Sequence, residues 1–184
     1  MIKIRNGCFE TNSSSSHAMI MMKENRSVPQ MFTPSRWMDD NGILSIFKDD
    51  LEFGRSPFSV LTDWYHKMCY AIASYGKDGF KEIEALLYKR LDGLKKIEFW
   101  GNETEYSKYG YVDHQSNGLL QAFLKEYDIQ LEDFIFNDRY MVVIDGDEYR
   151  VFKDMLDVGL INESEIEVIK GVYDDEYKDP QLCV

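Results

Sequence analysis

The sequence YMVVI, residues 140–144, is the most strand-like stretch of the chain. It is apolar throughout, and a short apolar run without alternation is typical of a strand that is covered on both faces. The turn sequence Asp145-Gly146-Asp147 follows it directly. We therefore expect residues 140–144 to form the central strand of a sheet.

Shorter stretches predict further elements around this strand. The continuous apolar run at 18–23 is too short for a lone helix and suits a buried strand, whereas the imperfect alternation at 165–170 suits an edge strand. The buried strand is expected at 18–23 and the edge strand at 165–170. Further strands are expected at 1–9 and 94–100, and short elements of either type at 43–47 and 131–136, with a short strand and a helix within 148–159.

Three longer stretches carry the apolar period of helices. The first starts after Pro57 and ends at Gly76, and the second runs from Asp78, its N-cap, to about Leu91. A third helix is expected from about 118 to 127. Strands and helices interleave without a strict βαβ rhythm. We therefore expect an α+β (mixed α/β) fold in which two or more helices pack on a central sheet.

Length and composition suit one domain. The chain has 184 residues, and 44% of them are hydrophobic, which is enough to build a core. We expect residues 1–172 to form a single α+β domain and residues 173–184 to form an acidic, frayed C-terminal tail.

Acidic residues outnumber basic ones. There are 33 Asp and Glu against 21 Lys and Arg, and the formal net charge is −12. Such a chain does not bind nucleic acid through its overall field, and needs a local basic patch, a metal ion or a basic partner protein to do so. It can instead occupy the basic groove of a nucleic-acid-binding protein and compete with the phosphates. The plain alternative is that the charge serves solubility.

Cysteine usage and the N-terminal sequence favour the cytoplasm. Cys8, Cys69 and Cys183 are widely spaced and form no CxxC pair, which disfavours a disulfide framework and a thiolate zinc site. The start, MIKIRNGCFE, has no apolar signal region, and the sequence contains no run of 18 apolar residues. We expect a soluble cytoplasmic protein with no membrane partner.

The stretch ETNSSSSHAM, residues 10–19, concentrates polar side chains between two expected strands. Ser, Thr and Asn side chains bond nearby backbone amides and fold such segments into compact turns. Their hydroxyls and free amides can also hold a phosphate, and His17 adds a group that titrates near neutral pH. Neither a P-loop nor a GxSxG elbow is present. The alternative is a polar turn whose His17 binds a backbone carbonyl.

A second polar stretch, GYVDHQSNG, contains the adjacent residues Asp113 and His114. Neighbours in an extended segment point to opposite faces, so Asp113 is better placed to serve another histidine, and His17 is a candidate. The alternative is a loop with an exposed histidine.

A third stretch, IDGDEYR at residues 144–150, places carboxylates at the end of the strongest strand. Carboxylates in this position often hold Mg²⁺ or orient a substrate. A solvated Asp-Gly hairpin is the simpler explanation. His66 lies beside the apolar stripe of the first expected helix, and we expect it to be structural.

Two histidines in separate polar loops suggest one composite site. Two imidazoles can cleave RNA without a metal, because one activates the ribose 2′-hydroxyl and the other protonates the leaving oxygen. Two histidines and a carboxylate also suit a divalent transition metal, so a metal cofactor is an open alternative. The predicted catalytic residues are His17, His114, Asp113 and Glu10, and the predicted phosphate-binding residues are Thr11, Asn12, Ser13, Ser14, Ser15 and Ser16.

The stretch RNGCFETNSSSSHAM resembles the opening of a group of small proteins encoded by phages and prophages of Firmicutes. GYVDHQS and YMVVIDGDE also look like later blocks of that group. Small acidic phage proteins of this size include inhibitors of bacterial defence, among them anti-CRISPR proteins that bind Cas9 or damage its guide RNA. By size and gene neighbourhood, the resemblance implies an anti-defence protein in the host cytoplasm, with a defence effector or its guide RNA as partner.

Two main function classes follow. The first is a nuclease or related phosphoryl-transfer enzyme that uses the composite site. The second is a non-catalytic acidic inhibitor that blocks a nucleic-acid groove of a host protein with the carboxylate runs near 145–148 and 163–179. A virion or morphogenesis accessory protein is the third alternative.

Overall fold

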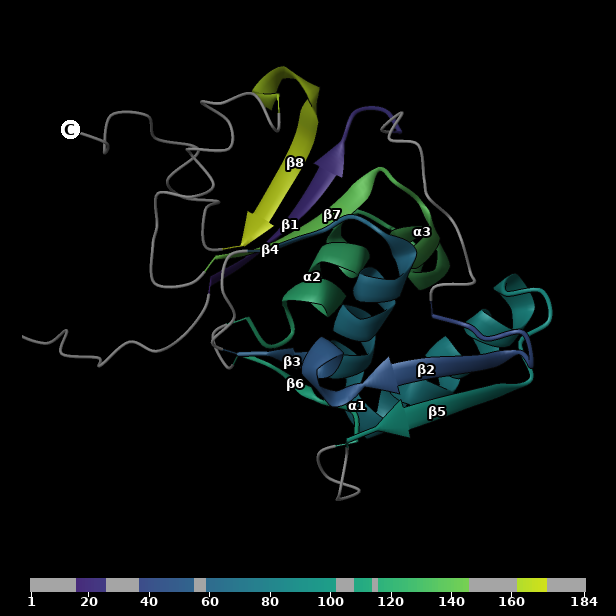
Figure 1. Ribbon diagram of the computed structural model, residues 1–184. Helices are drawn as coiled ribbons and strands as arrows, with labels where there is room; N and C mark the ends of the chain where they lie inside the picture. The colour runs from purple at the N-terminus through teal and green to yellow at the C-terminus, as the bar shows by residue number, and fades with distance from the viewer. Residues whose placement is uncertain are drawn as a thin grey trace, which may run out of the picture.

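The computed structural model describes residues 16–25, 37–54, 59–101, 108–113, 116–145 and 162–171. These residues form a four-stranded sheet, two pairs of short strands and helices that share one core (Figure 1). The fold is therefore α+β, with helices packed on the main sheet, as the sequence predicts. The strand expected at 1–9, the elements expected at 148–159 and the tail at 173–184 lie outside the described residues.

Strand β7 (Tyr140–Asp145) lies in the interior of the main sheet, whose order is β4-β7-β1-β8. Strand β1 (Ser16–Met22) runs antiparallel to β7 on one side and to β8 (Ile166–Gly171) on the other. The short strand β4 (Ser59–Leu61) pairs antiparallel with the remaining edge of β7. The expected central strand is confirmed, and so is the edge strand β8.

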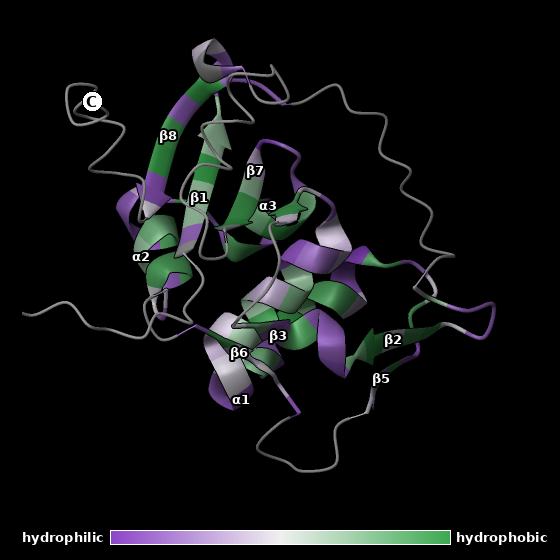
Figure 2. Cartoon of the chain, turned by 60° about the vertical axis from the view of Figure 1, so that its left-hand side comes forward, coloured by the Kyte–Doolittle hydropathy of each residue, from purple (hydrophilic) through white to green (hydrophobic). Residues whose placement is uncertain are grey.

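Both faces of the main sheet are apolar. Alternate residues of a strand point to opposite faces, and Met19 and Met21 of β1 join the cluster that contains the helices. Figure 2 shows hydrophobic stretches along β1, β7 and β8. Burial on both faces explains why YMVVI shows no alternation. The buried residues of the opposite face are Ala18, Ile20, Met22, Met141, Val143, Ile166 and Ile169.

Helix α1 (Trp64–Arg90) consists of two helices joined at Gly76, whose backbone has φ 61° and ψ −157°. The Asp63 carboxylate caps the first turn by accepting a hydrogen bond from the His66 amide at 3.0 Å. Two successive helices with a break at Gly76 are therefore confirmed. The predicted start after Pro57 is wrong, because residues 59–61 pair with the edge of β7 as strand β4.

A second layer lies on the other side of α1 from the main sheet (Figure 1). Strands β2 (Ile43–Phe47) and β5 (Lys96–Trp100) pair in parallel there. The 3-10 helix η2 (Lys48–Leu51) leads into β3 (Glu52–Phe53), which pairs with β6 (Tyr111–Val112). The other elements are α2 (Leu119–Glu126), α3 (Leu131–Phe136) and the 3-10 helix η3 (Glu163–Glu165).

The elements expected at 43–47, 94–100, 118–127 and 131–136 are all present, and the last of these is a helix. The sequence did not predict β3, β4 and β6, which are only two or three residues long. Within the described residues, no helix has the length and apolar character needed to cross a membrane.

Candidate functional site

Residues from the three polar stretches meet at one end of the main sheet. The Cα of Ser16, the first residue of β1, pairs with that of Asp145, the last residue of β7. Asp113 follows β6, and its carboxylate is close enough to His17 to raise the pKa of the imidazole. Segments that are far apart in the sequence therefore share this end of the sheet.

His17 lies on strand β1 and not in the loop that the sequence analysis predicted. Its Cα pairs with that of Ile144 on β7, and the next residue, Ala18, pairs with Gly171 on β8. The ladder to β7 extends beyond the apolar run to His17 and Ser16, whereas the ladder to β8 begins at Ala18. Pairing with β7 therefore draws the Ser-His sequence into the sheet. The His17 side chain is fully buried, on the helix-facing side that Met19 also occupies.

Helix α1 supplies the polar partner of His17. The distance between Nδ1 of His17 and the Tyr70 hydroxyl is 2.9 Å, and the Ser74 side chain hydrogen-bonds to the same hydroxyl. Burial raises the pKa of Tyr70, so its phenol stays protonated. With Ser74 donating to Tyr70 and Tyr70 donating to Nδ1, the neutral imidazole carries its own proton on Nε2.

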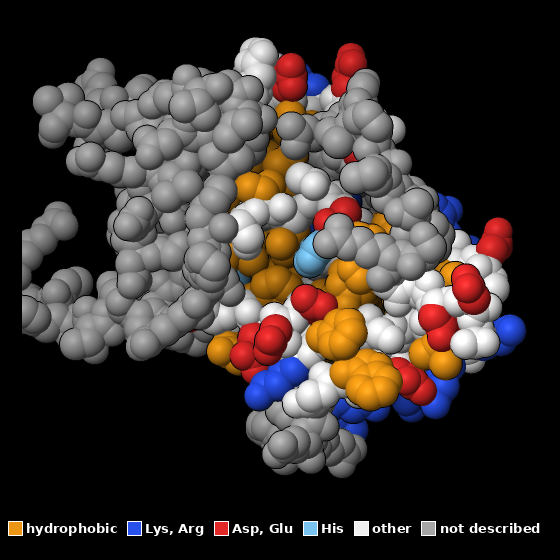
Figure 3. Space-filling view, viewed as in Figure 1, with side chains coloured by type: hydrophobic (Ala, Val, Ile, Leu, Met, Phe, Trp, Pro, Cys, Tyr) orange, Lys and Arg blue, Asp and Glu red, His pale blue; other side chains and the backbone are white. Residues whose placement is uncertain are grey.

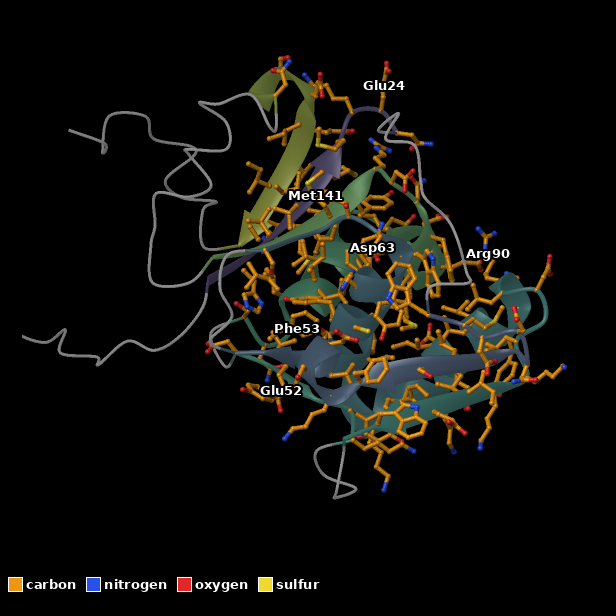
Figure 4. The ribbon with its side chains drawn as sticks, in the orientation of Figure 1. Glu24, Glu52, Phe53, Asp63, Arg90 and Met141 are labelled. Carbon is orange, nitrogen blue, oxygen red and sulfur yellow. The ribbon has the colours of Figure 1, made fainter. Side chains whose placement is uncertain are left out.

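Two neighbouring elements hold this chain of hydrogen bonds in place. The ring of Phe53, labelled in Figure 4, packs edge-on against Tyr70 with 5.0 Å between the centroids. On the other side, Nε2 of Gln121 in α2 donates to the Ser74 carbonyl at 2.8 Å. The network therefore ties β1, β3, α1 and α2 together.

The protonation state of His17 follows from its surroundings. Burial lowers the pKa of His17 to about 4, and the Asp113 carboxylate opposes part of this shift. The imidazole is therefore neutral at pH 7. A neutral imidazole has the protonation state of a general base, whereas the imidazolium that a general acid needs forms only near pH 4.

The segment after β6 brings more buried polar groups to this region. Asp113 is only 8% exposed, and its amide donates to the Phe53 carbonyl at 2.9 Å. Its carbonyl accepts a hydrogen bond from the Ser116 amide at 2.9 Å. The buried Ser116 hydroxyl makes no hydrogen bond within the described part of the chain. Asp113 and Ser116 thus give the region a buried carboxylate and a buried hydroxyl.

Most of the predicted site lies outside the described residues. These positions are Glu10, Thr11, Asn12, Ser13, Ser14, Ser15 and His114. The pairing of His17 with His114 and the phosphate-binding role of the Ser run therefore stay predictions. Among residues whose placement is described, no group of three or more His, Cys, Asp or Glu could hold a metal ion.

A second histidine–carboxylate pair lies at the start of α1, where Figure 4 labels Asp63. Nδ1 of His66 is 2.6 Å from Oδ2 of Asp63, and the two side chains are 38% and 41% exposed. Burial acts to raise the pKa of Asp63, but hydrogen bonds from the His66 ring and amide outweigh it and lower the pKa. The sequence predicts a structural His66 and does not predict this pair, although Asp and His three residues apart at a helix start are a usable signal.

Tyr70 is the member of the buried network that sequence reasoning could not find. It lies among the apolar positions of α1, where the apolar period predicts that an aromatic residue belongs to the core.

No protein-family model, curated protein or solved structure matches the chain. The chemistry of this region therefore rests on its geometry, which is a buried neutral imidazole fixed by a tyrosine, with a carboxylate beside it.

Proposed function

We propose that this protein counters a host defence system as a non-catalytic acidic inhibitor that occupies the nucleic-acid-binding groove of an effector protein. The full burial of His17 favours binding over catalysis. Its Nδ1 bonds to Tyr70 inside the core, and its low pKa keeps the ring neutral. Such a buried polar group serves the folded structure once its hydrogen bonds are made. The resemblance to phage proteins suggests the class of partner.

The charge of the chain suggests how it binds. Its 33 acidic residues against 21 basic ones complement a groove whose lysines and arginines otherwise hold phosphates. A hollow of about 280 Å³ supports this proposal, because its lining has three carboxylates, from Glu132, Asp133 and Asp138, against Arg90, which lies 3.5 Å from Glu132. Carboxylates on a folded scaffold attract a basic partner over several ångströms, and salt screens that attraction.

The test mixes this protein with an effector of the Cas9 class that carries an end-labelled guide RNA. We expect cleavage of the target DNA to fall with increasing protein while the guide RNA stays full-length. The inhibition should weaken as the salt concentration rises, because the attraction is electrostatic. Fragments of the guide RNA would contradict the proposal. So would an effector that keeps full activity at a large molar excess of this protein.

RNA cleavage is the second candidate function, and the Asp113 carboxylate beside His17 is the observation that favours it. A carboxylate that supports an imidazole is a common feature of general-base sites. In this case the histidine would accept the proton of a ribose 2′-hydroxyl. Its burial requires that neighbouring side chains move aside before RNA can reach the ring.

Three single variants separate the two functions. Labelled RNA is incubated with the wild type and with His17→Gln, Asp113→Asn and His66→Gln, each with EDTA, Mg²⁺ or Mn²⁺. Cleavage by the wild type and by the His66 control, but not by the other two variants, would support the enzyme. Absence of cleavage by the wild type, or equal cleavage by all four proteins, would rule out a role for His17 in RNA cleavage.

A further inference from the structure

We propose that the outer face of β2 and β5, centred on Phe47 and Trp100, is the surface that docks on the partner protein. This inference rests on the proposed inhibitor function and adds where the binding takes place. Phe47 and Trp100 are the last residues of their strands, and their Cα atoms are partners in the parallel register. Each of the two residues is 51% exposed. Register partners point to the same face, so two large rings stand side by side in solvent.

The inner face of this strand pair already supplies its packing. Leu44 and Ile46 are fully buried, and Ile97 and Phe99 pack against the main core. The outer rings therefore add exposed apolar surface that the core does not use. Figure 3 shows two large hydrophobic side chains next to each other in the lower half of the view, where β2 and β5 end in Figure 1. Exposed apolar surface of this kind marks interaction sites, and Trp is over-represented among residues that dominate binding energy.

The net charge of −12 favours a basic protein as the occupant. The sequence next to the two rings contributes the carboxylates of Asp49, Glu52 and Glu98, whereas the Asp50 carboxylate accepts a hydrogen bond from the hydroxyl of the buried Tyr65. Glu52 lies 3.5 Å from Lys48 and Glu98 lies 2.6 Å from Lys96, so these two pairs are neutral and Asp49 adds one negative charge.

The net negative charge of the chain disfavours the stacking of nucleobases on the rings, because it repels the phosphates of a strand. It complements a partner that presents an apolar side chain flanked by lysine or arginine. Such an arrangement is expected at the rim of a nucleic-acid-binding groove, and it matches the aromatic centre and polar rim of protein interfaces.

The edge of β5 gives the partner a way to align. The outer edge of β2 is used by residues 37–39, since the Ser45 amide donates to the Trp37 carbonyl and the Asp39 amide donates to the Ile43 carbonyl. Within the described residues, β5 pairs with β2 alone. An extended partner segment that adds to β5 would satisfy its edge amides and carbonyls and cover Trp100.

The experiment measures the affinity of a guide-free and a guide-loaded Cas9-class effector for three forms of this protein. These are the wild type, the double variant Phe47→Ala/Trp100→Ala and the control Tyr88→Ala, in which another exposed aromatic residue is removed. We expect the double variant to lose about 100-fold or more in affinity, as for two central anchors. The control should stay within about threefold of the wild type, the size of a contact outside an interface centre.

Each other result overturns the inference in a recognisable way. Equal affinities of the wild type and the double variant reject this surface and leave the proposed function standing. A wild type that binds no form of the effector rejects the proposed function, and this surface with it. The docking of a protein partner is also rejected if the double variant loses binding to labelled single-stranded RNA, or loses a self-association that the wild type shows in sedimentation.

A second variant keeps the test valid if the double variant unfolds. Glu98→Lys keeps both rings and changes the sign of one rim charge. We expect it to weaken effector binding at low salt and to lose much of this effect at high salt, because the change acts through charge. An unchanged or higher affinity at low salt would reject the basic partner.

Discussion

His17 makes the stability of this protein depend on pH. Burial lowers the pKa of the folded-state imidazole to about 4, whereas an unfolded histidine titrates near 6.5. Above pH 6.5 the imidazole is neutral in both states, so its ionisation does not change the free energy of unfolding. As the pH falls from 6.5 to 4, the unfolded chain takes up the proton first. Between pH 6.5 and pH 4 this group therefore lowers the free energy of unfolding by about 3 kcal/mol, because its pKa differs by about 2.5 between the unfolded and the folded state.

We predict that His17→Gln removes most of this dependence. Urea unfolding at pH 7.5, 6, 5 and 4 measures it, and the quantity of interest is the slope, since the variant also loses packing at every pH. The control His66→Gln should keep the wild-type decrease that His17 causes. Burial lowers the pKa of Lys67 to about 8, so this group contributes near pH 7.5, but equally in the wild type and both variants. Parallel curves for the wild type and His17→Gln would show that His17 is not a buried neutral base.

At the residue scale, the role of Asp113 toward His17 stays a prediction. It rests on the opposite directions of neighbouring side chains in a strand, and in the structure the Asp113 carboxylate acts to raise the pKa of His17. The burial of His17 was not predictable. A polar run at a strand start gives no sign that two neighbouring strands and the Tyr70 hydroxyl will enclose it.

At the level of elements, Gly76 lets one helical segment turn into the next. Its φ of 61° and ψ of −157° lie in a region that only glycine adopts readily, and a Cβ there would meet no atom within 4 Å. The cost of a side chain is therefore a backbone cost. We predict that Gly76→Ala destabilises the protein by about 1–3 kcal/mol, as measured by urea unfolding.

The matched control for this prediction is Gly118→Asn. Gly118 also has open space around a Cβ, but its φ of 80° and ψ of −3° are left-handed values that asparagine tolerates. It should cost about 1 kcal/mol or less, in line with the small penalty of that region for asparagine. Equal losses for the two variants would mean that the break at Gly76 has no special backbone requirement.

The elements that the sequence predicted share a physical property: each is long or apolar enough for its own pattern to decide its structure. Helix α1, with its break, and strand β7 are examples. Strands β3, β4 and β6 have two or three residues, and long-range pairing alone defines them. For the same reason residues 59–61 were assigned to a helix, because their pairing with β7 is invisible in the local sequence.

At the scale of the whole molecule, the order of the sheet is a property of distant segments. Strand β1 lies near the start of the described chain, yet it separates β7 from β8, and both come from the last third of the sequence. No local pattern contains this order. The apolar character of both faces of β1 and β7 indicates that these two strands are internal, but it does not indicate which strands flank them.

The net charge of −12 also acts on the molecule as a whole, and it sets the last prediction. Folding brings the excess carboxylates closer together, so their mutual repulsion is larger in the folded state than in the expanded unfolded chain. The Debye length falls from about 30 Å at 0.01 M salt to about 8 Å at 0.15 M, so salt relieves this repulsion. Exposed ion pairs such as Lys89–Glu132 lose some strength over the same range, but each contributes about 1 kcal/mol at most. We therefore predict that the melting temperature rises by about 3 °C, or about 1 kcal/mol, between these salt concentrations. NaCl and KCl should act alike at equal ionic strength if the effect is screening. A melting temperature that falls with salt would mean that the ion pairs, and not the excess carboxylates, dominate the electrostatics of the fold.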